Sequence, residues 1–212
     1  MIRWRDGRVE SVRDASPGVA EVTAATADGP VSAIAYVALV GRPEVGDRVL
    51  LNTTTLALGL GTGGFALVVA MPDRLPPDID EPGHIVKARY TPMQATVLAV
   101  DEQGSPHHDV LRDADDLEGM PVVIADLHSA VPPILAGLRE RRPQTRVAYV
   151  MSDGGALPLW FSRSVAGLRE AGWLDATVTV GQAFGGDLEA VTVHTGLLAA
   201  RHVLGAEVAV VT

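Results

Sequence analysis

The feature that most constrains the fold is an alternation of strand-like and helix-like segments between residues 122 and 211. Short apolar runs occur at 122–125, 146–151, 176–180 and 208–211. Strands separated by segments of helical length predict right-handed βαβ units and therefore a parallel sheet. The run at 122–125 is apolar throughout, which is typical of a parallel strand buried on both faces.

Three helices are predicted between these strands. The first carries Val131, Ile134, Leu135 and Leu138 at helical spacing, and the second carries Phe161, Val165 and Leu168 and ends at Gly172. Asp187 is a suitable N-cap for the third, whose buried stripe is predicted to be Val193, Leu197, Ala200 and Leu204.

The first part of the chain predicts a different fold. Residues 1–82 contain short strand-like runs at 8–13, 18–23, 31–40, 48–51, 55–60 and 65–71, separated by turn residues. This spacing favours a small antiparallel β-barrel or sandwich. The segment 71–82 is rich in proline and acidic residues, as expected of a linker. We therefore expect two domains, a small all-β domain at 1–82 and a parallel α/β domain at 83–212, the latter opening with strands near 85–90 and 95–100.

Composition narrows the class of partner and the compartment. The net charge of −9 argues against a nucleic acid or an anionic membrane as the main partner. The uncharged stretch 49–71 is long enough to cross a bilayer, but its glycines favour a buried β-hairpin. No signal peptide is visible, so a bacterial cytoplasmic protein is expected. Because the chain has no cysteine, a metal site would need histidine and carboxylate ligands.

Chemistry is expected where strands lead into helices, because ligands of open parallel sheets bind beyond the carboxyl ends of the strands. The three relevant turns read DLHS at 126–129, SDGG at 152–155 and GQAFGGD at 181–187. The candidate catalytic residues are Asp126 and His128; the candidate ligand-binding residues are Ser129, Asp153, Gly154, Gly155, Gln182, Gly185, Gly186 and Asp187.

Each candidate has a functional and a structural interpretation. Asp126 and His128 are two residues apart on one face, so they could hold a divalent metal, or His128 could act as a general base. Alternatively, Asp126 and Ser129 cap the following helix, and His128 is a turn histidine whose ring nitrogens are bonded to neighbouring groups. Asp153 could bind a ligand hydroxyl or ammonium group, whereas the glycines beside it could simply form a turn. A cofactor is not identified, with a divalent metal as one option.

Familiar catalytic motifs are missing from the sequence. There is no G-x-S-x-G elbow, no H-E-x-x-H motif, and no glycine-rich nucleotide fingerprint. Ser129 is a poor nucleophile for His128, because adjacent side chains diverge on extended backbone. Serine hydrolase chemistry is therefore disfavoured. Lys87 is the single lysine, which leaves little room for Schiff-base chemistry.

Several long runs are characteristic when taken together. They are LGTGG at 60–64, GHIVKARYTPMQ at 83–94, DLHS at 126–129, AYVMSDGGALP at 148–158 and ATVTVGQAFGGDLEA at 176–190. In these runs the chain resembles the bacterial family catalogued as domain of unknown function 3866. The resemblance implies no established activity, cofactor or catalytic residue. Members of that family usually extend further, so a truncated member is one interpretation.

Two kinds of function remain open. The favoured one is an enzyme acting on a small molecule or a phosphate ligand at the three turns. The alternative is a non-catalytic ligand sensor or an oligomeric assembly protein, so a homo-oligomer is not excluded.

Overall fold

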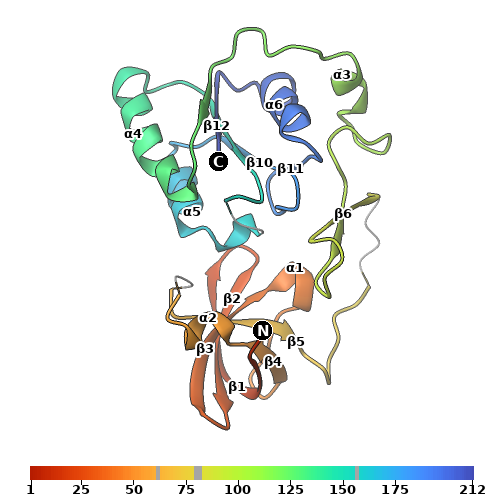
Figure 1. Cartoon of the computed structure of the whole chain (residues 1–212), viewed down its shortest axis with the longest axis vertical. Coiled ribbons are helices and arrows are strands. Elements are labelled where there is room, and N and C mark those ends of the chain that lie inside the picture. Colours follow the sequence, from red (N-terminus) through yellow and green to blue (C-terminus); the bar gives the residue numbers. More distant parts are fainter. Residues whose placement is uncertain (61–62, 79–82, 156–157) are drawn as a thin grey trace. The chain divides into compact units, whose positions relative to one another are not determined.

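The protein divides into two compact units, Met1–Ile79 and Asp80–Thr212 (Figure 1). The computed structural model describes residues 1–60, 63–78, 83–155 and 158–212. The domain boundary predicted at residue 82 falls outside the described residues. Each unit is described below by itself.

The first unit is a closed β-barrel. Its elements are β1 (Trp4–Ser16), β2 (Val19–Thr26), β3 (Gly29–Tyr36), α1 (Val37–Val40), β4 (Arg48–Asn52), α2 (Thr54–Ala57) and β5 (Ala66–Ala70). The strands follow the order β1-β2-β3-β5-β4, and β4 pairs with β1 to close the barrel. Alternate side chains point inward, so Val9, Val22, Val49 and Leu51 are almost fully buried. The predicted small β-barrel is confirmed.

Two of the strand predictions in this unit are wrong in part. Residues 54–57 form the one-turn helix α2 within the strand expected at 55–60, and residues 37–40 form α1 at the end of the strand expected at 31–40. Local bonds account for α2, because Thr54 donates its N–H to Asn52 Oδ1 and accepts a hydrogen bond from the N–H of Arg3 at its hydroxyl.

The stretch at 49–71 does not form a long helix. Strands β4 and β5 pair antiparallel across it, so a hairpin forms, but its first strand is 48–52 and not the predicted segment 55–60. Residues 61–62 of the glycine turn lie outside the described residues. Among the helices that the structure describes, none has both the length and the apolar character required to cross a membrane.

The second unit is an α/β fold (Figure 1). Its strands are β6 (Ile85–Lys87), β7 (Ala95–Val97), β8 (Val122–Ile124), β9 (Val147–Met151), β10 (Ala176–Thr179), β11 (Leu188–Glu189) and β12 (Val208–Val211). Its helices are α3 (His108–Arg112), α4 (Val131–Arg141), α5 (Arg163–Glu170) and α6 (Val193–His202), with 3-10 turns η1 (His128–Ala130) and η2 (Leu159–Phe161).

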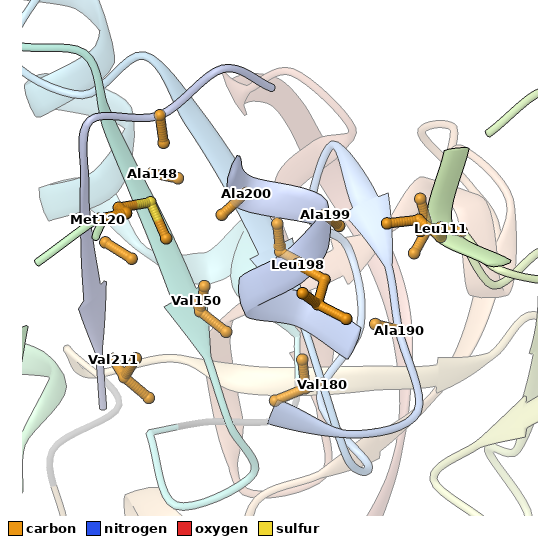
Figure 2. Packing of buried hydrophobic residues seen from close by; sticks show 14 residues of the cluster. Leu111, Met120, Ala148, Val150, Val180, Ala190, Leu198, Ala199, Ala200 and Val211 are labelled. Carbon is orange, nitrogen blue, oxygen red and sulfur yellow. The ribbon is translucent and has the colours of Figure 1, made fainter. Parts of the chain in front are cut away.

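Five of these strands form one parallel sheet in the order β11-β10-β9-β12-β8. Val147, Tyr149 and Met151 of β9 pack with α4 and α5, whereas Ala148 and Val150 face α6. Figure 2 shows Val150 and Val180 beside Leu198, Ala199 and Ala200 of α6. The sheet therefore lies between two helical layers, and the predicted parallel α/β architecture is confirmed.

Three predictions made from local sequence differ from the structure. Strand β8 lies at the edge of the sheet, and Ile124 is 78% exposed, so the prediction of a fully buried strand is wrong. Asp187 does not cap α6, because β11 intervenes and Thr192 accepts the N–H of Thr195 instead. Val193 is 39% exposed, and the buried residues of α6 are Gly196, Leu198, Ala199 and Ala200, of which only Ala200 was expected.

Candidate functional site

The turns that follow β8, β9 and β10 lie at one edge of the sheet because these strands are parallel. Residue Thr212, which directly follows β12, lies between the first two turns. Its carbonyl oxygen accepts hydrogen bonds from the N–H and the hydroxyl of Ser152, at 2.9 and 2.8 Å. Thr212 is therefore part of this edge, although the sequence did not mark it as a candidate.

His128 is the centre of a chain of hydrogen-bonded side chains at this edge. Its Nδ1 lies 2.7 Å from the hydroxyl of Tyr149, and its Nε2 lies 2.6 Å from the hydroxyl of Ser162. The Tyr149 hydroxyl is in turn 2.6 Å from Oγ1 of Thr212. The order Ser162–His128–Tyr149–Thr212 joins residues that follow or belong to four different elements.

Local structure holds the two residues on either side of His128. Ser162 is the N-cap of α5, where its Oγ accepts the N–H of Val165 at 3.0 Å. Tyr149 lies in the middle of β9 and is completely buried beneath α4 and α5. A buried phenol needs a partner for its hydroxyl, and His128 and Thr212 provide it. The imidazole is therefore held between a rigid strand and the first turn of a helix.

Burial sets the protonation states along the chain. It lowers the pKa of His128, so the imidazole is neutral at pH 7 and one ring nitrogen keeps a lone pair. It raises the pKa of Tyr149 to about 12, so this side chain is a neutral phenol. A neutral histidine bonded to a serine hydroxyl and oriented by a third group is the arrangement of a general base with its nucleophile.

The other two candidates of the first turn lie apart from this chain. Asp126 and Ser129 are exposed, and neither has a hydrogen bond to a side chain or an ion pair in the described part of the molecule. The capping alternative is also wrong, because Ala130 is the N-cap of α4 and no side chain caps that helix. Asp126 is thus exposed to solvent, and among the described residues no hydrogen bond joins it to His128.

The second turn packs tightly against its neighbours. A Cβ on Gly155 would lie 3.1 Å from both Thr212 Oγ1 and Met151 Cγ, and a Cβ on Gly181 would lie 2.8 Å from Asp153 Oδ1. Gly181 also has a φ of +66°. Asp153 and Gly154 are exposed, so the structure brings the second and third turns together with the Asp153 carboxylate between them.

The third turn is fixed by its own polar groups. Gln182 accepts the N–H of Arg89 at its Oε1, and Gly185 donates its N–H to Glu189. Gly186 donates to the hydroxyl of Thr179, and a Cβ there would lie 2.9 Å from Thr179 N. These residues shape the turn, and the backbone N–H groups of Gly185 and Gly186 already bind protein groups.

Asp187 is not brought to this edge of the sheet. Its carboxylate accepts hydrogen bonds from Arg169 and from the N–H and hydroxyl of Thr177, near the beginning of β10. The sequence placed it with the turn because β11 was not anticipated. Its contacts join β11 to α5 and β10, which is a structural role.

Lys87 is the least expected contributor to the third turn. Its side chain is fully buried, and Nζ donates to the carbonyl oxygens of Thr179, Ala183 and Ala190 at 3.1, 2.7 and 2.9 Å. Nζ also lies 3.1 Å from Glu189 Oε2. Burial lowers the pKa of Lys87 and raises the pKa of Glu189, and the attraction between them opposes both shifts.

A metal ion would need several histidine or carboxylate side chains close together. No group of three or more histidine, aspartate or glutamate side chains with suitable spacing occurs among the described residues. Both ring nitrogens of His128 are already bonded to protein hydroxyls. A two-ligand metal site at Asp126 and His128, which their spacing suggested, stays a prediction.

Sequence reasoning missed Tyr149, Ser162 and Thr212. Ser162 precedes a helical pattern and could have been recognised as an N-cap. Tyr149 is the polar-tipped side chain of an otherwise apolar strand, which signals a partner for its hydroxyl. No local pattern could have shown that both partners converge on His128.

Comparison with known proteins adds one match. The model of the family described as "Protein of unknown function (DUF3866)" matches residues 32–212, which covers most of both units. No curated protein and no solved structure matches the chain.

Proposed function

The chain belongs to the family of unknown function DUF3866, and from its own residues we propose that it is a small-molecule enzyme using Ser162 and His128. The proposed reaction is acyl transfer from an ester or thioester, at the edge of the sheet where β8, β9 and β12 end. The observation that carries the proposal is the bond of 2.6 Å between Ser162 Oγ and His128 Nε2. The bacterial cytoplasm is the proposed compartment.

The proposed reaction begins with proton transfer from Ser162 to His128. As Ser162 Oγ bonds to the carbonyl carbon of the substrate, His128 Nε2 takes the hydroxyl proton. The same proton then passes to the leaving oxygen or sulfur as the bond to the acyl carbon breaks. Water attacks the acyl-serine by the same route, with His128 again accepting a proton and returning it to Ser162.

Two neighbours support these steps. In the tautomer that the reaction requires, His128 donates Nδ1–H to Tyr149, and Tyr149 donates its hydroxyl proton to Thr212 Oγ1. The imidazole is thereby held with its Nε2 lone pair toward Ser162. Because Ser162 is the N-cap of α5, the positive end of the helix dipole lies close to the negative charge that develops during attack.

Acylation with an activated ester tests the proposal directly. With 4-nitrophenyl acetate we expect a rapid release of one equivalent of nitrophenolate per chain, and one acetyl group on the peptide that contains Ser162. Ser162→Asn should abolish both signals while keeping the helix cap, because asparagine caps well. His128→Ala should slow acylation by roughly 10²- to 10⁴-fold.

A cap on another helix provides the matched control. Thr192 caps α6 in the same manner as Ser162 caps α5, so Thr192→Asn should leave acylation unchanged. Acylation that persists in Ser162→Asn, or a folded wild-type chain that is never acylated, would contradict the proposal. If the folded wild-type chain is never acylated but a small molecule stabilises it to heat, the sensor alternative is favoured.

A further inference from the structure

The loop between β6 and β7, residues 88–94, is held against the third turn of the site. Lys87, immediately before it, is buried with three carbonyl partners and Glu189. The N–H of Arg89 then donates to Gln182 Oε1 at 2.9 Å. Two consecutive anchors therefore fix where the loop leaves β6, next to the carboxyl end of β10.

The backbone of this loop is strained where it passes the anchors. Ala88 and Tyr90 have φ values of +49° and +62°, a region that residues other than glycine rarely adopt. Such strain persists only where surrounding contacts impose it. Tyr90 is 99% exposed, so its own side chain makes little contact that would explain the conformation.

Arg89 carries a charge that the fold does not use. Arg112, Arg169 and Arg201 form ion pairs with carboxylates, and Arg139 and Arg146 donate to carbonyl oxygens. In the described part of this unit the guanidinium of Arg89 has no hydrogen bond and no ion pair, and the side chain is exposed. Arg141 and Arg142 also have no side-chain partner among the described residues, but they lie at the C-terminal end of α4, where the helix dipole favours a cation.

A short series of contacts connects this loop with Ser162. Gln182 belongs to the turn in which Phe184 accepts the N–H of Leu159, at 2.9 Å. Leu159 in turn accepts the N–H of Ser162 at 2.9 Å, and Trp160 packs on Phe184 with ring centroids 5.4 Å apart. Arg89 and Ser162 thus border the same turn, Arg89 through Gln182 and Ser162 through η2.

We propose that Arg89 and Tyr90 form the acyl-binding arm of this site, and that the acyl group it takes ends in a carboxylate. A guanidinium matches a carboxylate with two parallel hydrogen bonds, and the exposed Tyr90 ring provides an apolar face for the carbon chain between the two ends. The inference rests on the proposed acyl transfer at Ser162. It makes Arg89 a residue that determines specificity.

Half-esters of dicarboxylic acids test this arm. Wild-type protein is acylated with 4-nitrophenyl half-esters of increasing chain length and with uncharged 4-nitrophenyl alkanoates of matched length. At the best length we expect the carboxylate series to react roughly tenfold to hundredfold faster, the size of a charge-assisted hydrogen bond. Arg89→Gln should remove this preference, so that the two series react at similar rates. Arg142→Gln, which removes another exposed and unpaired arginine, should keep it.

Tyr90→Gly separates binding from backbone strain. Glycine tolerates the positive φ, so the unfolding midpoint should rise while the rate with the half-esters falls. A higher midpoint with no loss of rate would contradict the role of Tyr90.

Acyl transfer at Ser162 and carboxylate binding by Arg89 are tested by different results. Equal rates for both ester series, unchanged in Arg89→Gln, would overturn the carboxylate arm and leave acyl transfer intact. If no ester acylates Ser162, acyl transfer fails. In that case the arm is tested by binding alone. Free dicarboxylates should then raise the unfolding temperature of the wild-type protein and not that of Arg89→Gln, and any other result would contradict the arm.

Discussion

The hydroxyl oxygen of Ser162 lies 2.6 Å from Nε2 of His128, although 34 residues separate the two in the chain. Ser162 reaches this position as the cap of α5, and His128 reaches it in the 3-10 turn that precedes α4. Both helices pack on the same face of the sheet, over Tyr149. The pairing is therefore a consequence of helix packing.

The hydroxyl of Tyr149 should stabilise the fold as well as orient His128. Tyr149→Phe leaves a ring nitrogen of His128 and Oγ1 of Thr212 without their partner, so we expect a loss of about 1–3 kcal/mol. Thr212→Val removes the other hydroxyl at nearly constant volume. A double-mutant cycle by urea denaturation should yield a coupling of about 0.5–3 kcal/mol, and additive effects would show that the two hydroxyls do not interact.

Replacement of the buried lysine should be among the most damaging changes in the α/β unit. Lys87→Met removes a donor from three carbonyl oxygens, of which Thr179 O keeps the N–H of Ala190, and leaves Glu189 as an uncompensated charge, so we expect about 3–5 kcal/mol of destabilisation. Adding Glu189→Met should recover part of the loss, since no lone charge then remains buried. Arg112→Met breaks only exposed ion pairs and should not move the urea midpoint measurably. A similar midpoint for Lys87→Met and the wild type would refute this role.

Gly181 and Gly172 form a matched pair for the contact with Asp153. Their φ values are +66° and +68°, but a Cβ would meet the Asp153 carboxylate only at Gly181 and would find open space at Gly172. Alanine at either position should cost about 1–2 kcal/mol for the left-handed backbone. Gly181→Ala should cost more than Gly172→Ala, and Asp153→Ala should remove the excess. Equal losses would mean that the carboxylate moves aside freely.

The titration of His128 should make stability and acylation depend on pH in the same direction. Burial lowers the pKa of His128 below its ordinary value of 6.5, so the unfolded chain binds this proton more tightly than the folded one. The contribution to stability is complete above pH 6.5 and is lost as pH falls toward the folded pKa. Acylation should decline over the same range, because protonated His128 cannot accept a proton from Ser162.

Two measurements check this pH dependence. Unfolding free energies between pH 5 and 8, compared for the wild type and His128→Asn, isolate the contribution of this histidine. Acylation rates of the wild type over the same range should show an inflection below pH 6.5. An inflection above pH 6.5 would contradict the effect assigned to burial.

Much of the fold was predictable because it follows from local periodicity. The runs predicted at 146–151, 176–180 and 208–211 contain the parallel strands β9, β10 and β12, and the spacing of Val131 and Leu135 marked the buried face of α4. The barrel was predictable for a similar reason, since short strands with turn residues between them have few ways to bury one face. Those predictions depend only on neighbours in the chain.

The candidate site was predicted in position and only partly in composition. The turns after β8, β9 and β10 meet at one edge, and His128 lies there with its ring nitrogens bonded to side chains from β9 and from the cap of α5. Asp187 was assigned to this edge and instead binds Arg169 and Thr177. The reason is that Asp187 directly precedes the short strand β11, which runs parallel to β10. Sequence spacing alone did not distinguish these two outcomes.

The sequence by itself determined that the chain has a β-module followed by a parallel α/β module, and that no cysteine is present to contribute to its chemistry. Tertiary structure alone decided that β12 inserts between β8 and β9, leaving Ile124 exposed and placing Thr212 beside Tyr149. The physical reason is that periodicity records which face of an element is buried, whereas strand order and helix packing depend on contacts between residues distant in the chain. The bond between Ser162 and His128 belongs to that second kind.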